Sequence, residues 1–520
     1  MKIEKIPLEK TGAFSRLFLD YVKEHDNVRP FYSLYPRLEN FSSQIEARGG
    51  FDVKKRIFLR EAINTQYSGI EKHEKFIENL KNLASPTAFT VVTGHQLNIF
   101  AGPLYFIYKI VTAINLCKQL KEAFPAFQFI PVYWMASEDH DFEEINRFSL
   151  FNKEYAWQTD QTGPVGRFRL DGIREVVDAL PEKLALFERA YLHQKNLADA
   201  TRFFVNELFG KEGLIVVDPD HPLLKKGLKS VIRDELFHQY SNKAVEETTA
   251  QLEQAGYERQ VTGRDINLFY IETGLRERIV KEGGHFHVLN TNKRFDEAAI
   301  LELIERHPEN FSPNVVLRPL YQEIILPNLA YVGGPAETAY WLQLKKVFEI
   351  YKTPFPIILP RNFALVINKN NARKMKKINI DPEDLFHDLP GLIEKYLAKN
   401  GKDYKLDREA DEIRKVFEEI QNKAASLDAG LKSLIGAEEA KTLKSLEHIE
   451  KKMKKAEEKR HEIALNQLES LKEKLFPDGK LQERKDNFLN FYLNDPGFID
   501  MLLQNLDPLD FAMNVFIDEP

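Results

Sequence analysis

A dense group of ionisable side chains follows an apolar run in the first third of the chain. The run Phe129–Ala136 is predicted to be a buried strand, and Glu138-Asp-His-Asp-Phe-Glu-Glu144 comes just after it. Clustered carboxylates repel one another, so the pKa of at least one should rise unless a cation or hydrogen bonds offset the charge. That suits a general base, a metal site or recognition of a substrate amine; the alternative is a solvated acidic loop. The predicted catalytic residues are Glu138, Asp139, His140 and Asp141.

A second polar group surrounds the end of the preceding apolar run. Gly94 permits a tight turn, and Pro103 suits the first turn of a helix that follows. The free N–H groups at a helix start attract anions, so phosphate or carboxylate binding is predicted here. An ordinary strand-to-helix turn is the alternative. The substrate-binding candidates in this stretch are Thr93, Gly94, His95, Gln96, Asn98, Gly102, Pro103, Tyr105 and Lys109.

The stretch Arg318–Glu337 has the same order of features, and we predict a strand, a glycine-proline turn and a helix. Glu337 falls in the first helical turn, where the helix dipole favours a carboxylate. It is either a cap or a ligand for a substrate ammonium or hydroxyl group. Arginine and glutamine side chains before the turn can bind a carboxylate or phosphate. The further substrate-binding candidates are Arg318, Gln322, Gly333, Gly334 and Glu337.

These groups need a parallel sheet to bring them together. Two short apolar runs flanking a helical run are typical of a βαβ unit, and ligands bind beyond the carboxyl ends of such strands. Further core strands are predicted at 213–220 and 355–361, and helices over much of 1–85. Short strands are expected at 148–150, 154–158, 165–170, 268–272 and 285–289. Cys117 is predicted to be a core residue, and His285 and His287 to be structural, so no metal site is assigned.

The region 376–480 differs in character from the rest. Apolar residues spaced alternately by four and three form a heptad seam in Ile413–Leu434, and a second charged helix follows at about 437–475. With Gly436 as the turn, these predict an antiparallel coiled-coil hairpin. A hairpin of that length usually finds a partner surface, so a homodimer is expected. The aromatic-rich tail around Phe488 should pack back on the protein.

Composition restricts the function classes. The 520 residues carry a formal net charge of −6, which gives no reason to expect a nucleic-acid partner. No apolar run of 18 residues appears, and the N-terminus has no apolar signal core, so no membrane span or secretion is expected. The single cysteine excludes intrachain disulfides. Together these favour a cytoplasmic location.

Taken together, these motifs resemble the bacillithiol biosynthesis cysteine-adding enzyme family over essentially the full length. His95 stands where glutamine is more frequent in that family, and both side chains can donate and accept hydrogen bonds. The resemblance lies in Val28–Tyr32, Thr93–Gln96, Gly102–Tyr105, Tyr108-Lys109, Trp134–Asn146, Tyr331–Glu337 and the tail Asn487–Tyr492.

The resemblance implies an α/β fold, with a Rossmann-like parallel-sheet core, connecting insertions and a C-terminal α-helical antiparallel coiled coil that dimerises. The expected domains are residues 1–375, with insertions at about 147–212 and 257–312, then a coiled-coil domain over 376–480, and a terminal segment over 481–520 that packs back. The resemblance also implies a nucleotide site near the coiled coil, for which the candidates are Asn487, Phe488 and Tyr492.

The function implied is ligation of cysteine to the amino group of glucosaminyl-malate, the last step of bacillithiol synthesis. The cysteine carboxylate would be activated by ATP, with Mg²⁺, as in class I nucleotidyl-transferring ligases; no permanent cofactor is expected. One alternative is another nucleotide-dependent ligase or transferase that uses the same cleft. The other is a dimeric, non-catalytic scaffold for the pathway.

Overall fold

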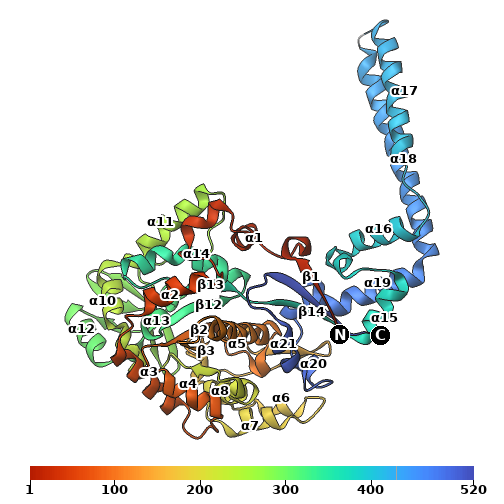
Figure 1. The fold of residues 1–520 in the computed structure, drawn as a ribbon. Helices are drawn as coiled ribbons and strands as arrows, with labels where there is room; N and C mark the ends of the chain where they lie inside the picture. Colours follow the sequence, from red (N-terminus) through yellow and green to blue (C-terminus); the bar gives the residue numbers. More distant parts are fainter. Residues whose placement is uncertain (429, 520) are drawn as a thin grey trace.

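A five-stranded parallel sheet forms the centre of the larger domain (Figure 1). The computed structural model describes residues 1–428 and 430–519. The strand order is β13-β12-β2-β3-β6, and every neighbouring pair is parallel, which confirms the predicted parallel core. The strands are β2 (Ala88–His95), β3 (Gln128–Met135), β6 (Ile215–Val217), β12 (Asn328–Gly333) and β13 (Ile357–Pro360).

Helices cover the sheet because parallel strands need crossover connections and have two apolar faces to bury. Helix α5 (Tyr105–Ala123) joins β2 to β3 and is buried along most of its length, with Cys117 only 5% exposed. Helix α14 (Pro335–Ile350) joins β12 to β13. The predicted helices before β2 are α1 (Arg16–Val22), α2 (Asn40–Arg48), α3 (Val53–Gln66) and α4 (Glu74–Asn82).

The first insertion contains a short hairpin and mostly helices. Strands β4 (Arg147–Leu150) and β5 (Lys153–Ala156) pair in antiparallel fashion, as predicted. The strand predicted at 165–170 is wrong: Val165–Arg167 forms a 3-10 turn, because the N–H of Gly166 is taken by Ser137 rather than by a strand. The helices up to the second insertion are α6 (Arg174–Asp178), α7 (Ala185–His193), α8 (Leu197–Phe209), α9 (Pro222–Lys225), α10 (Lys229–His238) and α11 (Tyr240–Gln254).

The second insertion is a five-stranded antiparallel sheet, larger than the sequence indicated. The strand expected directly after Arg318 is instead helix α13 (Arg318–Ile325), because Pro319 sits in its first turn and one face is buried. The elements are β7 (Leu268–Glu272), β8 (Leu275–Glu282), β9 (His285–Val288), β10 (Arg294–Phe295), α12 (Glu297–Arg306) and β11 (Phe311–Pro313).

A helical arm projects from the body of the molecule (Figure 1). Helices α17 (Asp407–Ala425) and α18 (Leu431–Arg460) pack side by side in the arm, which confirms the coiled-coil hairpin. The predicted turn at Gly436 is wrong, since Gly436 lies inside α18. The chain reverses earlier, where the Asp428 side chain accepts the N–H of Gly430 and ends the helical pattern. The arm stands on α15 (Lys369–Ile378), α16 (Leu389–Asn400) and α19 (Glu462–Leu475).

The two ends of the chain meet in a three-stranded sheet, β1-β15-β14. Strand β14 (Phe363–Ile367) follows β13 almost directly and pairs in parallel with β15 (Ala512–Ile517). Strand β1 (Lys2–Pro7), which the sequence analysis missed, pairs with β15. Helices α20 (Leu489–Tyr492) and α21 (Phe498–Asn505) lead into β15. Within the described ranges, no helix is long and apolar enough to cross a membrane.

Candidate active site

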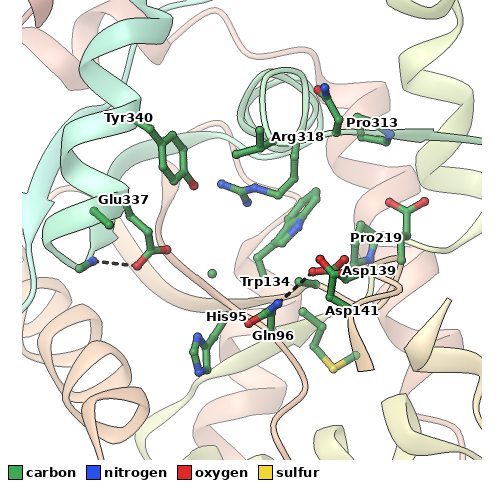
Figure 2. Close-up of a pocket in the computed structure, with 18 of the residues that line it drawn as sticks. His95, Gln96, Trp134, Asp139, Asp141, Pro219, Pro313, Arg318, Glu337 and Tyr340 are labelled. Atoms are coloured by element: carbon green, nitrogen blue, oxygen red, sulfur yellow. Dashed lines mark hydrogen bonds between the residues drawn. The ribbon is translucent and has the colours of Figure 1, made fainter. Parts of the chain in front are cut away.

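A cavity of about 660 Å³ opens where strands β2, β3, β12 and β13 end. This is the carboxyl edge of the parallel sheet, where the strands leave backbone groups and following helix starts facing a common space. Figure 2 shows side chains from opposite walls converging on it. Twelve predicted residues line the cavity: Gly94, His95, Gln96, Tyr105, Lys109, Glu138, Asp139, His140, Asp141, Arg318, Gly334 and Glu337.

Other predicted residues lie outside the lining. Helix α5 starts at Tyr105, after Gly102 at φ +54°, and the Leu104 N–H is taken by the carbonyl of Asp486. The Leu104 N–H, just before α5, is therefore not free for an anion, although Tyr105 in the first turn of the helix lines the cavity. The predicted residues that do not line the cavity are Thr93, Asn98, Gly102, Pro103, Gln322 and Gly333.

The three nucleotide-site candidates also lie away from this cavity. Asn487 donates hydrogen bonds to the carbonyls of Phe100 and Gly102, 2.8 and 2.7 Å away, and Phe488 is fully buried in the core. A second cavity, of about 840 Å³, lies beside α19, but its lining includes neither of these residues nor Tyr492. A nucleotide-binding role for the three residues stays a prediction.

Close packing at the end of β2 explains why glycine stands there. A Cβ on Gly94 would lie 3.0 Å from the Tyr331 hydroxyl and 3.4 Å from an Arg318 nitrogen. Glycine thus lets both side chains approach the strand end. The Lys109 ammonium reaches back to the same place and donates to the Gly94 carbonyl over 2.8 Å.

One wall of the cavity is built around Glu337 at the start of α14. Its carboxylate forms an ion pair with Lys109 and accepts hydrogen bonds from the Tyr331 hydroxyl (2.6 Å) and the Gly334 N–H (2.8 Å). Burial alone would raise the pKa of Glu337, but the lysine and the two hydrogen bonds outweigh it and lower the pKa to about 2. Glu337 is therefore ionised and acts as the cap of the helix.

This lowered pKa predicts how stability depends on pH. The carboxyl binds a proton near pH 4.5 in the unfolded chain but only near pH 2 in the folded one. Its stabilisation is thus full above pH 4.5 and is lost as the pH falls towards 2, by about 1.4 kcal/mol per pH unit. We expect Glu337→Gln to flatten the acid limb of a urea-denaturation series relative to wild type. Glu302→Gln, at a side chain of α12 that is 61% exposed, is the control. Identical curves for wild type and Glu337→Gln would contradict the assignment.

The same wall holds two arginine donors and one histidine nitrogen without partners. Within the described residues, Nη2 of Arg318, Nε of Arg361 and Nε2 of His95 are enclosed and make no hydrogen bond. Burial, and then the nearby Lys109, lower the pKa of His95 to about 3, so its ring is neutral. Buried donors usually have acceptors, and those left open in a cavity mark where a ligand oxygen fits.

The opposite wall is the acidic loop after β3. Glu138 is 7% exposed and forms an ion pair with the fully buried Lys225 of α9, which also donates to the Phe311 carbonyl over 2.7 Å. Burial raises the pKa of Glu138, and Lys225 opposes that rise. This predicted catalytic residue is thus tied to a structural partner that the sequence analysis did not identify.

Removing one member of this buried pair should be costly. Lys225→Met leaves the Glu138 carboxylate enclosed without a counter-charge, and we expect a loss of about 3–5 kcal/mol in the free energy of unfolding. The double variant Lys225→Met/Glu138→Leu should recover most of that loss. Urea denaturation measures both, with Lys211→Met as control because its pair with Asp500 is half exposed. A loss below 1 kcal/mol in Lys225→Met would show that the pair does not stabilise the fold.

The other loop residues face the cavity more openly. Gln96 donates to Asp139 (3.1 Å), and Arg276 from β8 donates to Nδ1 of His140 (2.6 Å). The hydrogen on the His140 ring is therefore on Nε2, which lies 4.0 Å from Asp141. The side chain of Asp141 is 58% exposed, which makes it the most exposed of the carboxylates that line the cavity. Ligand atoms of Asp139, His140 and Asp141 lie within 4.8 Å of one another, close enough to hold a metal ion.

The structure adds cationic residues that the sequence analysis missed. Arg276 and Arg264 come from the second insertion, and Arg484 comes from the C-terminal segment; no local pattern marks them. Arg361 is the last residue of the predicted strand at 355–361 and directly follows β13, so the rule that ligands bind at strand ends could have found it. With Lys109 and Arg318, these arginines give the lining more cations than carboxylates.

The fold and site define a two-domain α/β protein with a charged cavity at the carboxyl edge of a parallel sheet and a coiled-coil arm. Residues 1–362 match the family model described as "Bacillithiol biosynthesis BshC, N-terminal Rossmann-like domain". Residues 364–517 match the "C-terminal coiled-coil domain" of the same family. The chain therefore belongs to the BshC family of bacillithiol biosynthesis.

Full-length relatives agree with this assignment. A protein of Cytophaga hutchinsonii is 42% identical, over 99% of this chain and 98% of its own length. One of Flavobacterium psychrophilum is 43% identical, over 99% of each chain. A more distant relative, from Chlorobaculum tepidum, is 30% identical over 95% of this chain and 94% of its own length. All three bear the name "Putative cysteine ligase BshC".

Proposed function

We propose that the protein ligates L-cysteine to the amino group of glucosaminyl-malate, forming an amide in the last step of bacillithiol synthesis. The observation that carries this proposal is the two-sided cavity. One wall offers carboxylates for an ammonium group, and the other offers unpartnered arginine donors for carboxylates (Figure 2). Glucosaminyl-malate carries both kinds of group, an amine on the sugar and two carboxylates on the malate. The names of the relatives support cysteine as the second substrate.

The acidic wall suits deprotonation of the amine. An ammonium group is no nucleophile, and Asp141, open to the cavity, is placed to accept its proton. The free amine then attacks the carbonyl carbon of the activated cysteine, a C–N bond forms, and the bond to the activating group breaks. Gln96 and Arg276 hold Asp139 and His140 in position beside this step.

The basic wall suits the anionic groups. Arg318 and Arg361 would bind the malate carboxylates or an activating phosphate, beside the start of α14 that Glu337 caps. Lys109 is engaged with Glu337 and fixes that helix start. Developing negative charge on the reacting carbonyl would be stabilised from the same side.

Activation of cysteine requires an energy source, because a free carboxylate and an amine do not condense unaided. We propose ATP with Mg²⁺ for this role. Asp139 and Asp141 supply the oxygen ligands that Mg²⁺ prefers. Asp141 would then act as base or as ligand, according to whether the metal is bound there.

An intact-mass assay tests the proposal. The full-length protein would be incubated with glucosaminyl-malate and cysteine, with and without ATP and Mg²⁺. Bacillithiol formed only with ATP, together with released AMP or ADP, would support the ligase and show which phosphate bond breaks. Product from a different acceptor in a substrate panel would favour another ligase or transferase. Absence of any product, with silent cavity variants, would favour the scaffold.

We also propose that the arm forms a homodimer. Its helices leave apolar side chains 39–59% exposed, and such a face is normally covered by a partner. The residues are Val416, Ile420, Leu434, Ile449 and Met453.

The double variant Ile420→Glu/Ile449→Glu should convert the dimer to a monomer because it places charges on this apolar face. Light scattering coupled to size exclusion measures the change. Val53→Glu, at an exposed apolar residue of the core domain, should leave the dimer intact. A monomeric wild-type protein would contradict the proposal.

A further inference from the structure

The C-terminal segment reaches the cavity. The 3-10 helix Gln482–Arg484 follows α19, after the coiled-coil arm in the chain, and the exposed side chain of Arg484 lines the cavity. All other lining residues come from the range 94–361. The second domain (residues 364–517) thus contributes Arg484 to a site that the first domain (residues 1–362) otherwise builds.

The neighbouring residue, Glu483, holds one of the cavity arginines. Its carboxylate pairs with both terminal nitrogens of Arg361, at 2.9 and 2.5 Å, and both side chains are 1% exposed. A bidentate, fully enclosed pair fixes the plane of the guanidinium group as well as its position. Arg361 also lies over the rings of Tyr105 and Phe363, which restrict it further.

This arrangement leaves one donor of Arg361 for a ligand. Its Nε makes no hydrogen bond within the described part of the chain and lies 3.8 Å from where a Cβ on Gly334 would stand. The free N–H is therefore beside the start of α14, where the Gly334 N–H is already taken by the Glu337 carboxylate, so the unpartnered donor here is the arginine and not the helix N-cap. An enclosed N–H without an acceptor is costly, and an anionic ligand would relieve that cost.

The segment is anchored on both sides, so Glu483 cannot easily follow a displaced arginine. The Gln482 amide donates to the Val366 carbonyl (3.1 Å) and accepts the Val366 N–H (2.9 Å), an added link along β14. On the other side, the Asp486 carbonyl accepts the Leu104 N–H over 2.8 Å. The position of Glu483 is thus set by the docking of the second domain on the first.

We propose that the second domain completes the anion-binding end of the cavity. Arg484 contacts an oxyanion of the ligand, a carboxylate or a phosphate, and Glu483 is a positioning residue that directs Nε of Arg361 at the same oxyanion. The inference deepens the proposed function but depends on it only for the identity of the anion.

Isothermal titration of the full-length protein with two separate probes, L-malate and inorganic pyrophosphate, tests the proposal. We expect wild type to bind one of them, which distinguishes a carboxylate site from a phosphate site. Arg484→Ala should weaken that binding about tenfold, the effect of one charge-assisted hydrogen bond. Lys480→Ala, an exposed lysine outside both cavities, should leave it unchanged. No binding of either probe, or equal affinity in Arg484→Ala and wild type, would overturn the proposal.

A double-mutant cycle separates positioning from stability. Glu483→Gln should weaken probe binding about fivefold in wild type but cause no further loss in an Arg361→Met background, because the residue acts through that arginine. A purely structural glutamate would lower the melting temperature and leave affinity unchanged, and that result would overturn its positioning role. If Glu483→Gln does not fold, Arg484→Ala, at an exposed side chain, still decides whether the second domain contributes. Anion binding without product formation would keep this inference and remove the proposed function.

Discussion

Asp141→Asn is expected to lower the turnover number about 10²- to 10⁴-fold, the range found when a general base is removed. Asparagine keeps the shape of the side chain but cannot accept the proton of the substrate ammonium. The Asp141 side chain is 58% exposed and makes no hydrogen bond within the described residues, so the free energy of unfolding should change by no more than about 0.5 kcal/mol. The measurement is the rate of bacillithiol formation, alongside a urea-denaturation curve.

The matched control is Glu143→Gln, in the same acidic run. Glu143 is 80% exposed, pairs with Arg147 and does not line the cavity, so its neutral variant should turn over at the wild-type rate. A wild-type rate in Asp141→Asn would remove this residue from the chemistry. Asp139 would then be the next base to test, since its hydrogen bond from Gln96 keeps it at the cavity wall.

Arg318→Met is expected to lower kcat/KM about 10²- to 10³-fold, as for loss of one preorganised donor in a transition state. One terminal nitrogen of Arg318 donates to Gln322 over 3.2 Å, while the other is enclosed and unpartnered within the described residues. Its guanidinium group lies over the rings of Tyr331 and Trp341, 5.4 and 6.0 Å from their centroids. The group is therefore held in place before any substrate arrives.

Two further variants make the Arg318 prediction specific. Arg318→Lys keeps the charge but not the planar fork, so it should recover only part of the lost activity. Arg306→Met, 72% exposed on α12, should have wild-type kinetics. No carboxylate lies within ion-pair distance of Arg318 in the described structure. Arg318→Met therefore leaves no buried carboxylate without a counter-charge, and its melting curve should stay close to that of the wild type. Activity within twofold of wild type would exclude Arg318 from the anion-binding wall.

The sequence alone determined the core of the fold. Runs of apolar residues and the glycine-proline turns between them correctly located β2, α5, β3, β12 and α14. These signals depend only on residues close together in the chain. The heptad seam located the arm for the same reason. Local signals gave the wrong result in two places. The residues directly after Arg318 form a helix and not a strand, and the arm turns at Asp428 and not at Gly436.

Half of the site followed from the same local information. Residues after consecutive parallel strands must share one edge of the sheet, so the acidic loop and the two strand-to-helix turns could be expected near one another. The tertiary structure decided which of them face the cavity. It paired the Leu104 N–H, before α5, with the C-terminal segment, and it placed the start of α14, capped by Glu337, at the cavity wall.

Only the tertiary structure revealed the partners that set charge and position. Lys225 lies 87 positions from Glu138, and Glu483 lies 122 positions from Arg361. Nothing in the spacing of these residues pairs them, because an ion pair between separate elements depends on how the elements pack and not on the chain between them. Burial then raises the pKa of Glu138 and lowers that of His95, while Lys109 and hydrogen bonds outweigh burial at Glu337, and all of these causes are properties of the packed molecule. The sequence determined which residues could do the chemistry, and the packing of the two domains decided which of them are free to do it.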